Sequence, residues 1–482
     1  KTEKNIRPIT DYLFPNKEEL EGAALHFWQD QNSSLWIGTL NGIYKLDPKK
    51  QLFDRIAIPM VDGWVVNRMY VDQQTKRDSL LWVQYEYATL HLYDLIHQKP
   101  RPLPAKLEKY NQIESVNNDF YIDRKGRVWL ASSMNGIVVY DKSSDQINLP
   151  HIEHSLGKDL KFLEIYEDRE GTLYFSCIYG LFRYSESKNA IEEVTEFNSY
   201  VSKNKLGLYV RDLCFDSKNR MWAIAMDLDS PLHYLYCQDP FTKSFHGFNQ
   251  KDHADLNQLP SFENIICIEG DRILINSYSG YGIGSLRKNQ LDFKSYTHIG
   301  KTPMIANKMA AMDNQKNVWM CSDNGVYLLN NKQNRLSIFN RNNSVIERTL
   351  NSRIFYSSQS DRLYLNQKNY LLTCKTDQFN FVGKDQIRLT DVSISQMPGL
   401  KPSNFSKLIL SPEQNSIQLH FSNLNLTNSQ NNFYEYRLNG DSTWTGIEGS
   451  ELHFNNMGYG DYLLEVRGYN SFGVLSNKNY KA

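Results

Sequence analysis

Apolar and polar residues alternate along this chain in short runs, and turn residues separate the runs. Alternation with period two predicts β-strands that end at turns. One stretch shows the unit clearly, because Gly126 and Gly136 supply the positive φ that its two tight turns favour. The pattern predicts a strand ending at 120–123 and further strands over 127–132, 137–141 and 146–149.

The same unit returns eight times, each copy following a polar turn centred on Asp. A period in the mid-forties built from short strands is typical of a β-propeller with one four-stranded blade per repeat. The recurring tryptophan is interpreted as a core residue between adjacent blades, with its indole N–H bonded to a backbone carbonyl. Successive anchors lie 45 to 52 residues apart, at Trp36, Trp82, Trp129, Tyr174, Trp222, Leu274, Trp319 and Tyr364.

The repeat pattern ends near residue 385, where strands at sandwich-like spacing begin. We therefore predict an all-β chain, with a propeller of eight repeats over 1–384 and an immunoglobulin-like β-sandwich over 385–482. The repeats could form one eight-bladed ring, a seven-bladed ring with an extra repeat, or a fragment of a longer ectodomain; we favour a single ring. The predicted sandwich strands are 385–395, 411–422, 432–438, 452–455 and 462–469.

The composition of the chain argues against some classes of binding partner and bears on its location and its cysteines. Equal numbers of basic and acidic residues, 54 of each, give no electrostatic basis for binding nucleic acid or an anionic membrane surface. No run approaches the roughly 18–20 apolar residues of a membrane span, so we expect a soluble fragment or mature ectodomain whose signal and anchor lie outside it. The six cysteines lie in strand-like runs without CxxC spacing, which favours buried free thiols over a disulfide framework.

Two motifs resemble known modules. The repeat, clearest at 35–39 and 42–44 (LWIGT, then GIY), resembles the two-component-regulator propeller repeat. The tail resembles the triple-tyrosine (Y_Y_Y) domain, through Phe433-Tyr434-Glu435-Tyr436-Arg437-Leu438, Trp444, Gly460-Asp461-Tyr462 and Asn470-Ser471-Phe472-Gly473.

The resemblance implies the periplasmic sensor region of a hybrid two-component system of Bacteroidetes, which detects glycan breakdown products. It implies an inner-membrane anchor in the full-length protein, with a kinase and a DNA-binding output domain outside this chain. It also implies a homodimer through the C-terminal domain, no cofactor and no catalytic residue here. The commonest sensors of this kind carry about twice as many repeats, arranged as two seven-bladed propellers.

An oligosaccharide ligand is expected on the propeller face that carries the loops between second and third strands and the connections between blades. These loops differ among the repeats and are rich in aromatic and carboxylate side chains, which suit sugar rings and hydroxyls. The alternative is a structural role, in which the tyrosines cap the blades and pack on one another. The candidate ligand-binding residues are Trp64, Tyr85, Tyr87, Tyr179, Asp227, Asp229, Tyr278, Tyr281, Asp323 and Asn324.

Other functions have weaker support in the sequence. His151 and His154 lack a third ligand nearby, so we predict a solvated loop and no metal site. Two alternatives stay open: a propeller lyase or hydrolase acting on glycans, and a protein-interaction scaffold. Two carboxylates and a base converging in the central channel would favour the enzyme, and a large apolar patch without a pocket would favour the scaffold.

Overall fold

The computed structural model divides into two compact units, which are described separately. Unit 1 comprises residues 1–53, 335–346 and 378–482, and unit 2 comprises residues 54–334 and 347–377. The structure describes residues 24–29, 35–46, 53–57, 66–73, 78–85, 89–153, 160–204, 209–227, 230–239, 241–299, 302–304, 307–322, 325–330, 335–339, 353–367, 370–379, 386–394, 397–400, 407–423, 432–470 and 475–482.

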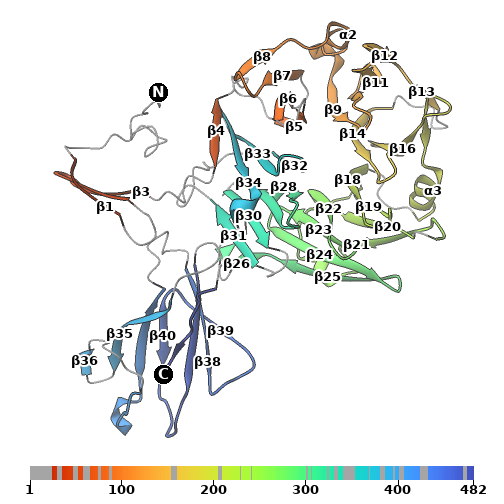
Figure 1. Ribbon diagram of the computed structural model, residues 1–482. Helices are drawn as coiled ribbons and strands as arrows, with labels where there is room; N and C mark the ends of the chain where they lie inside the picture. Colours follow the sequence, from red (N-terminus) through yellow and green to blue (C-terminus); the bar gives the residue numbers. More distant parts are fainter. Residues whose placement is uncertain are drawn as a thin grey trace. The chain divides into compact units, whose positions relative to one another are not determined.

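Unit 2 contains seven successive, mainly antiparallel sheets among its described residues (Figure 1). In chain order they are β5 (Val66–Gln73), β6 (Asp78–Tyr85), β7 (Leu90–Asp94) and β8 (Lys99–Arg101); β9 (Asn117–Ile122), β10 (Val128–Ser132), β11 (Gly136–Asp141) and β12 (Gln146–Asn148); β14 (Phe162–Glu167), β15 (Leu173–Cys177), β16 (Gly180–Ser185) and β17 (Ala190–Glu193), with β13 (His151–Glu153) beside β17; β18 (Tyr209–Phe215), β19 (Met221–Met226), β20 (His233–Gln238) and β21 (Phe245–Asn249); β22 (Asn264–Ile268), β23 (Arg272–Ser277), β24 (Gly280–Arg287) and β25 (Gln290–Tyr296); β28 (Asn307–Met312), β29 (Val318–Ser322) and β30 (Gly325–Asn330); and β32 (Ile354–Ser357), β33 (Arg362–Gln367), β34 (Tyr370–Lys375) and β4 (Asp54–Ala57). The connections carry the ribbon of β26 (His298–Ile299) and β27 (Thr302–Pro303) and the helices α2 (Ala105–Glu108), α3 (Thr195–Lys203) and α4 (Ala254–Asn257).

The seven sheets close into a ring. The first strand of each sheet contacts the first strand of the next, in the order β5, β9, β14, β18, β22, β28 and β32, and β32 contacts β5 again. The last sheet is completed by β4, which comes from the other end of the chain and pairs antiparallel with β34 (Figure 1). The pairing of β4 with the last blade holds the ring shut, because its hydrogen bonds must break before this blade can open.

The first repeat does not form one of these seven blades. Its strands β1 (Ala24–Gln29), β2 (Leu35–Thr39) and β3 (Gly42–Leu46) form a separate three-stranded sheet in unit 1. The ring of unit 2 therefore has seven blades, and this division differs from our interpretation of 1–384 as one domain of eight repeats. The physical reason is that β4, which follows the first repeat in sequence, pairs with the last blade instead of with β3.

Trp82, Trp129 and Trp222 pack against the next blade as predicted, whereas Trp36 is half-buried in the sheet of the first repeat. Trp129, Trp222 and Trp319 are fully buried, and Trp129 contacts Phe175 of the next blade with ring centroids 5.8 Å apart. A backbone carbonyl was the wrong partner for the indole N–H, because a turn carboxylate accepts it instead. Trp129 Nε1 donates to Asp123 Oδ2 at 2.8 Å.

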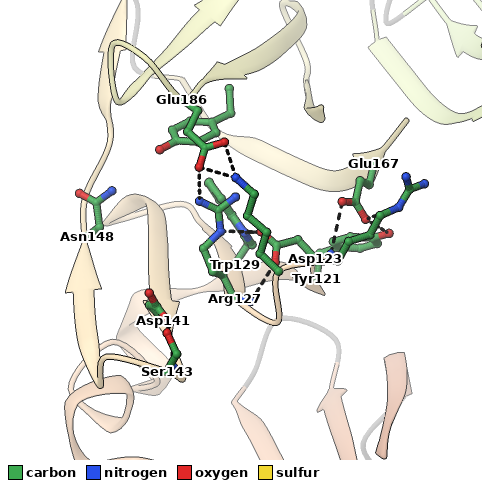
Figure 2. Close-up of polar contacts among 12 residues, drawn as sticks. Tyr121, Asp123, Arg127, Trp129, Asp141, Ser143, Asn148, Glu167 and Glu186 are labelled. Atoms are coloured by element: carbon green, nitrogen blue, oxygen red, sulfur yellow. Dashed lines mark hydrogen bonds and ion pairs between the residues drawn. The ribbon is translucent and has the colours of Figure 1, made fainter. Parts of the chain in front are cut away.

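That carboxylate also builds the turn before the strand. Asp123 Oδ1 accepts the Arg127 backbone N–H at 2.8 Å, and its Oδ2 accepts the Arg127 side chain at 2.7 Å (Figure 2). Asp216 with Trp222, and Asp313 with Trp319, repeat the arrangement. In these three blades one Asp therefore fixes both the turn and the core tryptophan six residues later, which explains the polar turn before these copies.

The C-terminal part of unit 1 is a β-sandwich. One sheet has the order β36-β35-β37-β40 and the other β39-β38-β41-β42, with Val392, Phe421, Tyr434 and Val466 among the buried core residues. The predicted all-β fold class, a propeller followed by a sandwich, is confirmed. The strands are β35 (Arg388–Ile394), β36 (Met397–Leu400), β37 (Ile417–Ser422), β38 (Phe433–Leu438), β39 (Thr445–Ile447), β40 (Glu451–Phe454), β41 (Leu464–Tyr469) and β42 (Tyr480–Lys481), and unit 1 also contains β31 (Arg335–Phe339).

Candidate functional site

The first strands of the seven blades surround a central channel with a cavity of about 610 Å³. Each of these strands begins opposite the end of the second strand in its own blade, as Tyr209 pairs with Met226 and Asn264 with Asn276. The channel mouth at the start of the first strands therefore lies on the same face as the loops between second and third strands. This is the face on which we expected a ligand.

Polar residues occupy equivalent positions around the mouth. In each blade, one residue of the first strand pairs with the anchor, as Tyr121 pairs with Trp129 and Cys214 with Trp222. The equivalent mouth position lies two residues before it, at Asp119 and Asp212 in these blades. The pairing of five of the seven first strands is irregular at this point, and such bulges re-aim side chains. Six of the seven positions are polar: Arg68, Asp119, Glu164, Asp212, Asn264, Met309 and Arg353.

Three of these side chains hold neighbouring blades together. Asp119 Oδ2 accepts the backbone N–H of Ile165 at 2.8 Å, and Asp212 Oδ2 accepts that of Ile265 at 2.8 Å. Asn264 Oδ1 continues the pattern by accepting the N–H of Ala310 at 2.9 Å. Because each bond runs to the first strand of the next blade, these residues have a structural role in the ring.

Two arginines also bridge blades. Arg68 lies 3.0 Å from Asp119 and donates to the carbonyl of Ile165 at 3.1 Å, so it reaches across the second blade to the third. Arg353 of the last blade donates to the carbonyl of Val66 in the first at 3.1 Å. The guanidinium groups thus stabilise the ring at the mouth, including the place where it closes.

A second group of charged side chains at the mouth keeps hydrogen-bonding capacity. Arg211 Nη2 forms an ion pair with Glu263 Oε2, between the fourth and fifth blades. The Glu263 side chain is 6% exposed, and its Oε1 is buried without a hydrogen-bond partner among the described residues. Glu164 is half-buried and accepts the Tyr166 hydroxyl at 2.6 Å through Oε2.

The carboxylates at the mouth influence one another. Burial raises the pKa of Asp212 to about 7, and the negative charge of Glu164 adds to the effect. Burial likewise raises the pKa of Asp119 to about 7, although its contact with Arg68 works in the opposite direction. The mouth therefore combines neutral and charged acceptors with guanidinium donors, which is the mixture that hydroxyl groups of a ligand can use.

Five predicted ligand residues fall within the described part of the chain. Tyr179, half-buried in the β15–β16 turn, Asp227, half-buried after β19, and Tyr278, 48% exposed in the β23–β24 turn, share the face of the mouth. Tyr85 is fully buried, and Tyr281 is buried and stacks on Tyr296 at 4.9 Å. Tyr85 and Tyr281 thus have the packing role that we gave as the alternative. Trp64, Tyr87, Asp229, Asp323 and Asn324 lie outside the described residues.

The sequence reasoning missed the charged residues of the first strands. A signal existed, since Asp119, Arg211, Glu263 and Arg353 each lie ten or eleven residues before their anchor. In or next to a strand buried on both faces, charged residues that recur within one position of each other indicate a special environment. It went unused because we looked for function in the loops.

Two cysteines correct the expectation of six free thiols. Cys214 of β18 and Cys267 of β22 form a disulfide with Cα atoms 5.9 Å apart, and both line the channel. The others described as free are buried: Cys177, Cys237, Cys321 and Cys374. Sequence spacing could not reveal the pair, because the two residues meet across neighbouring blades and not within one.

Metal ligands do not gather in the described parts of the chain: no group of three or more His, Cys, Asp or Glu residues there could hold a metal ion. Of the histidine pair, His151 is exposed at the start of β13, and His154 lies outside the described residues. No helix within the described ranges is long and apolar enough to cross a membrane.

Comparison with known proteins agrees with the repeat pattern. No family model matches the chain. Histidine kinase P4 of Formosa agariphila is 22% identical over 374 residues, which are 73% of this chain and 26% of that protein. The extracellular domain of the hybrid two-component system BT3049 from B. thetaiotaomicron has a TM-score of 0.56 and 17% identity, over 95% of this chain and 61% of that one.

The resemblance predicted from the repeats is confirmed. The extracellular domain of BT4673, from the same organism, gives a TM-score of 0.50 at 17% identity over 97% of this chain and 63% of that one. This chain thus has the fold of extracellular domains of hybrid two-component systems. It spans about a quarter of the curated relative and about three fifths of the solved domains.

Proposed function

We propose that this chain is part of the ligand-sensing ectodomain of a membrane-linked two-component signalling protein. Its ligand would be an oligosaccharide derived from a glycan, bound on the face of the propeller that carries the channel mouth. The observation that carries the proposal is the fold shared with extracellular sensor-system domains over 95% of the chain. The kinase that reads the signal would lie in another part of the protein.

Two features of the chain support an extracytoplasmic sensor. A disulfide between Cys214 and Cys267 suits an oxidising compartment such as the periplasm, where we place the chain. The mouth of the ring offers guanidinium and carboxylate groups, and the half-exposed Tyr278 lies on the same face, a combination that matches sugar hydroxyls and ring faces.

Signalling requires that the ligand bind one arrangement of the ectodomain more tightly than another. Equal affinity for both arrangements would shift nothing. We propose that the C-terminal sandwich passes the change towards the membrane anchor of the full-length protein, and that the ectodomain acts as a homodimer through this domain. Sedimentation with and without ligand tests the dimer.

A thermal-shift screen of the chain against plant, host and microbial oligosaccharides tests the function. A ligand at 100 times its Kd stabilises the folded state by about 2.7 kcal/mol, which raises Tm by several degrees. A hit recovered intact supports a sensor. Absence of any shift across the panel would refute oligosaccharide sensing by this chain and favour a protein partner.

One observation favours a second candidate, a glycan lyase or hydrolase. Glu164 and Asp212 line the channel, the charge of Glu164 acts on both Asp212 and the buried Asp119, and Glu164 accepts the hydroxyl of Tyr166. Two of these carboxylates already accept backbone N–H groups, which favours structural roles for them. Conversion of a hit into shorter or unsaturated products would move the proposal to the enzyme.

A further inference from the structure

We propose that the channel mouth between the fourth and fifth blades holds a neutral, hydroxyl-rich sugar unit, with Arg211 and Glu263 as its main contacts and Glu164 as a third. This inference rests on the proposed function and narrows it to a position and a ligand class. It adds residues of the inner strands to a site that the sequence placed in the loops.

Unused hydrogen-bonding capacity at Glu263 distinguishes this pair from the other charged residues of the mouth, whose carboxylates and guanidiniums hold the ring together. Glu263 Oε1 is buried without a partner among the described residues, while Oε2 pairs with Arg211. A buried carboxylate oxygen without a donor is costly unless a ligand or water supplies one. The Arg211 side chain is 32% exposed, so its guanidinium is accessible while it holds Glu263 in place.

The other charged groups are already committed to the ring. Asp119 and Asp212 accept N–H groups of the following blades at 2.8 Å. Arg68 and Arg353 donate to backbone carbonyls of other blades at 3.1 Å. A ligand would have to break ring contacts to use them, whereas contacts to Glu263, Arg211 and Glu164 leave the ring intact.

Charge at the mouth favours a neutral ligand over an acidic one. The cavity is lined by five guanidinium groups and five carboxyl groups, so their formal charges balance, and Arg68 and Arg211 are already paired with carboxylates. A uronate or sulfate group beside Arg211 would also lie beside Glu263, which already neutralises that guanidinium, whereas hydroxyl groups can donate to the carboxylates and accept from Arg211. The charged lining residues are Arg68, Arg124, Arg169, Arg211 and Arg353 with Glu164, Glu167, Asp168, Asp212 and Glu263.

The channel has the size of a ligand site. Its volume of about 610 Å³ lies within the range of about 300–1,000 Å³ that is usual for small-molecule pockets. Apolar side chains of the first strands, including Met309 and Ile354, line it together with the polar groups. Polar contacts in a partly apolar wall are typical of sites that fix the orientation of a sugar.

Calorimetric titration of the chain with neutral disaccharides (cellobiose, lactose, mannobiose, xylobiose) and acidic ones (digalacturonate, a chondroitin disaccharide) tests the inference. We expect a neutral disaccharide to bind, and Glu263→Gln to weaken it about ten- to hundredfold because a charge-assisted hydrogen bond is lost. The matched control is Glu196→Gln, which breaks the ion pair with Arg183 (3.2 Å) on helix α3 and should leave the affinity unchanged.

The outcomes separate this inference from the proposed function. If a neutral disaccharide binds and Glu263→Gln leaves its Kd unchanged while Tyr278→Ala weakens it, the sensor stands and the channel site is wrong. If only acidic disaccharides bind, the ligand class is wrong. If no saccharide binds, both proposals fail. Should Glu263→Gln lower Tm strongly, Arg211→Gln is the second variant, and an unchanged Kd there overturns the inference.

Discussion

Reduction of the Cys214–Cys267 disulfide should destabilise the propeller strongly. The bond joins the first strands of the fourth and fifth blades, and it closes a loop across a sequence separation of 53 residues. In the chain-entropy description, the cross-link lowers the entropy of the unfolded chain by an amount that grows with loop length. For a loop of this size the expected stabilisation is about 4 kcal/mol.

The same free energy predicts a measurable shift in melting temperature. A change of 1 kcal/mol moves Tm by about 2–4 °C in domains of 150–250 residues, and by somewhat less in larger ones. We therefore expect Cys214→Ser/Cys267→Ser to lower Tm by roughly 6–12 °C relative to the oxidised wild type. Reduced wild type should match the double variant, because both lack the cross-link.

Differential scanning calorimetry with and without reductant measures this effect. The matched control is Cys374→Ser, because Cys374 is a buried free thiol and its variant should remain sensitive to reductant. Alkylation under denaturing, non-reducing conditions should label four cysteines. Six labelled cysteines, or a Tm that reductant does not change, would refute the bond and restore the expectation of six free thiols.

Two further predictions concern buried groups. The pKa of Asp212 is raised to about 7, so the folded state holds this proton more tightly than the unfolded state does. Protonated Asp212 therefore contributes up to about 4 kcal/mol to the free energy of unfolding. This contribution is fully present below pH 4 and is lost as the pH rises through 7. Urea unfolding should give a lower free energy of unfolding at pH 8 than at pH 5 in wild type, and a smaller difference between the two pH values in Asp212→Asn. An identical difference in the two proteins would contradict the prediction. Trp222→Phe should cost about 1–3 kcal/mol more than Trp82→Phe, because Trp222 donates to Asp216 whereas the Trp82 indole N–H has no partner among the described residues. Equal losses of unfolding free energy would contradict it.

The blades were predictable from the sequence because their determinants are local. The alternation of apolar residues sets each strand, and the Asp of each turn lies six residues before the tryptophan that it bonds, as Asp123 does before Trp129. Closure of the ring was not predictable, since Asp54–Ala57 has no repeat signature and its partner β34 lies more than 300 residues further on. Pairing over such a distance leaves no mark in either strand.

For the candidate site, the sequence likewise predicts the face of the propeller but not the role of each residue. Placing the ligand on the loop-rich face needed only the direction of the strands, and Tyr179, Asp227 and Tyr278 do share that face. Sequence could not separate these residues from Tyr85 and Tyr281, because in a propeller both faces of a strand are covered by neighbouring blades. An aromatic residue at a strand end then points into the core or into solvent by a rotation that periodicity does not encode.

The contacts around the channel also restrict how a ligand could produce a signal. Arg211 and Cys214 lie on β18, while Glu263 precedes β22 and Cys267 lies within it, so an ion pair and a disulfide join the same two first strands. Asp212 adds a backbone hydrogen bond between the same two blades, and Asp119 and Asn264 tie further blades together in the same way. Separation of the blades would break several of these bonds at once, so opening of the ring is an unfavourable response to ligand. A ligand at the mouth would instead favour one position of the whole ring, or one arrangement of the loops around the mouth, because either change leaves the inner bonds intact.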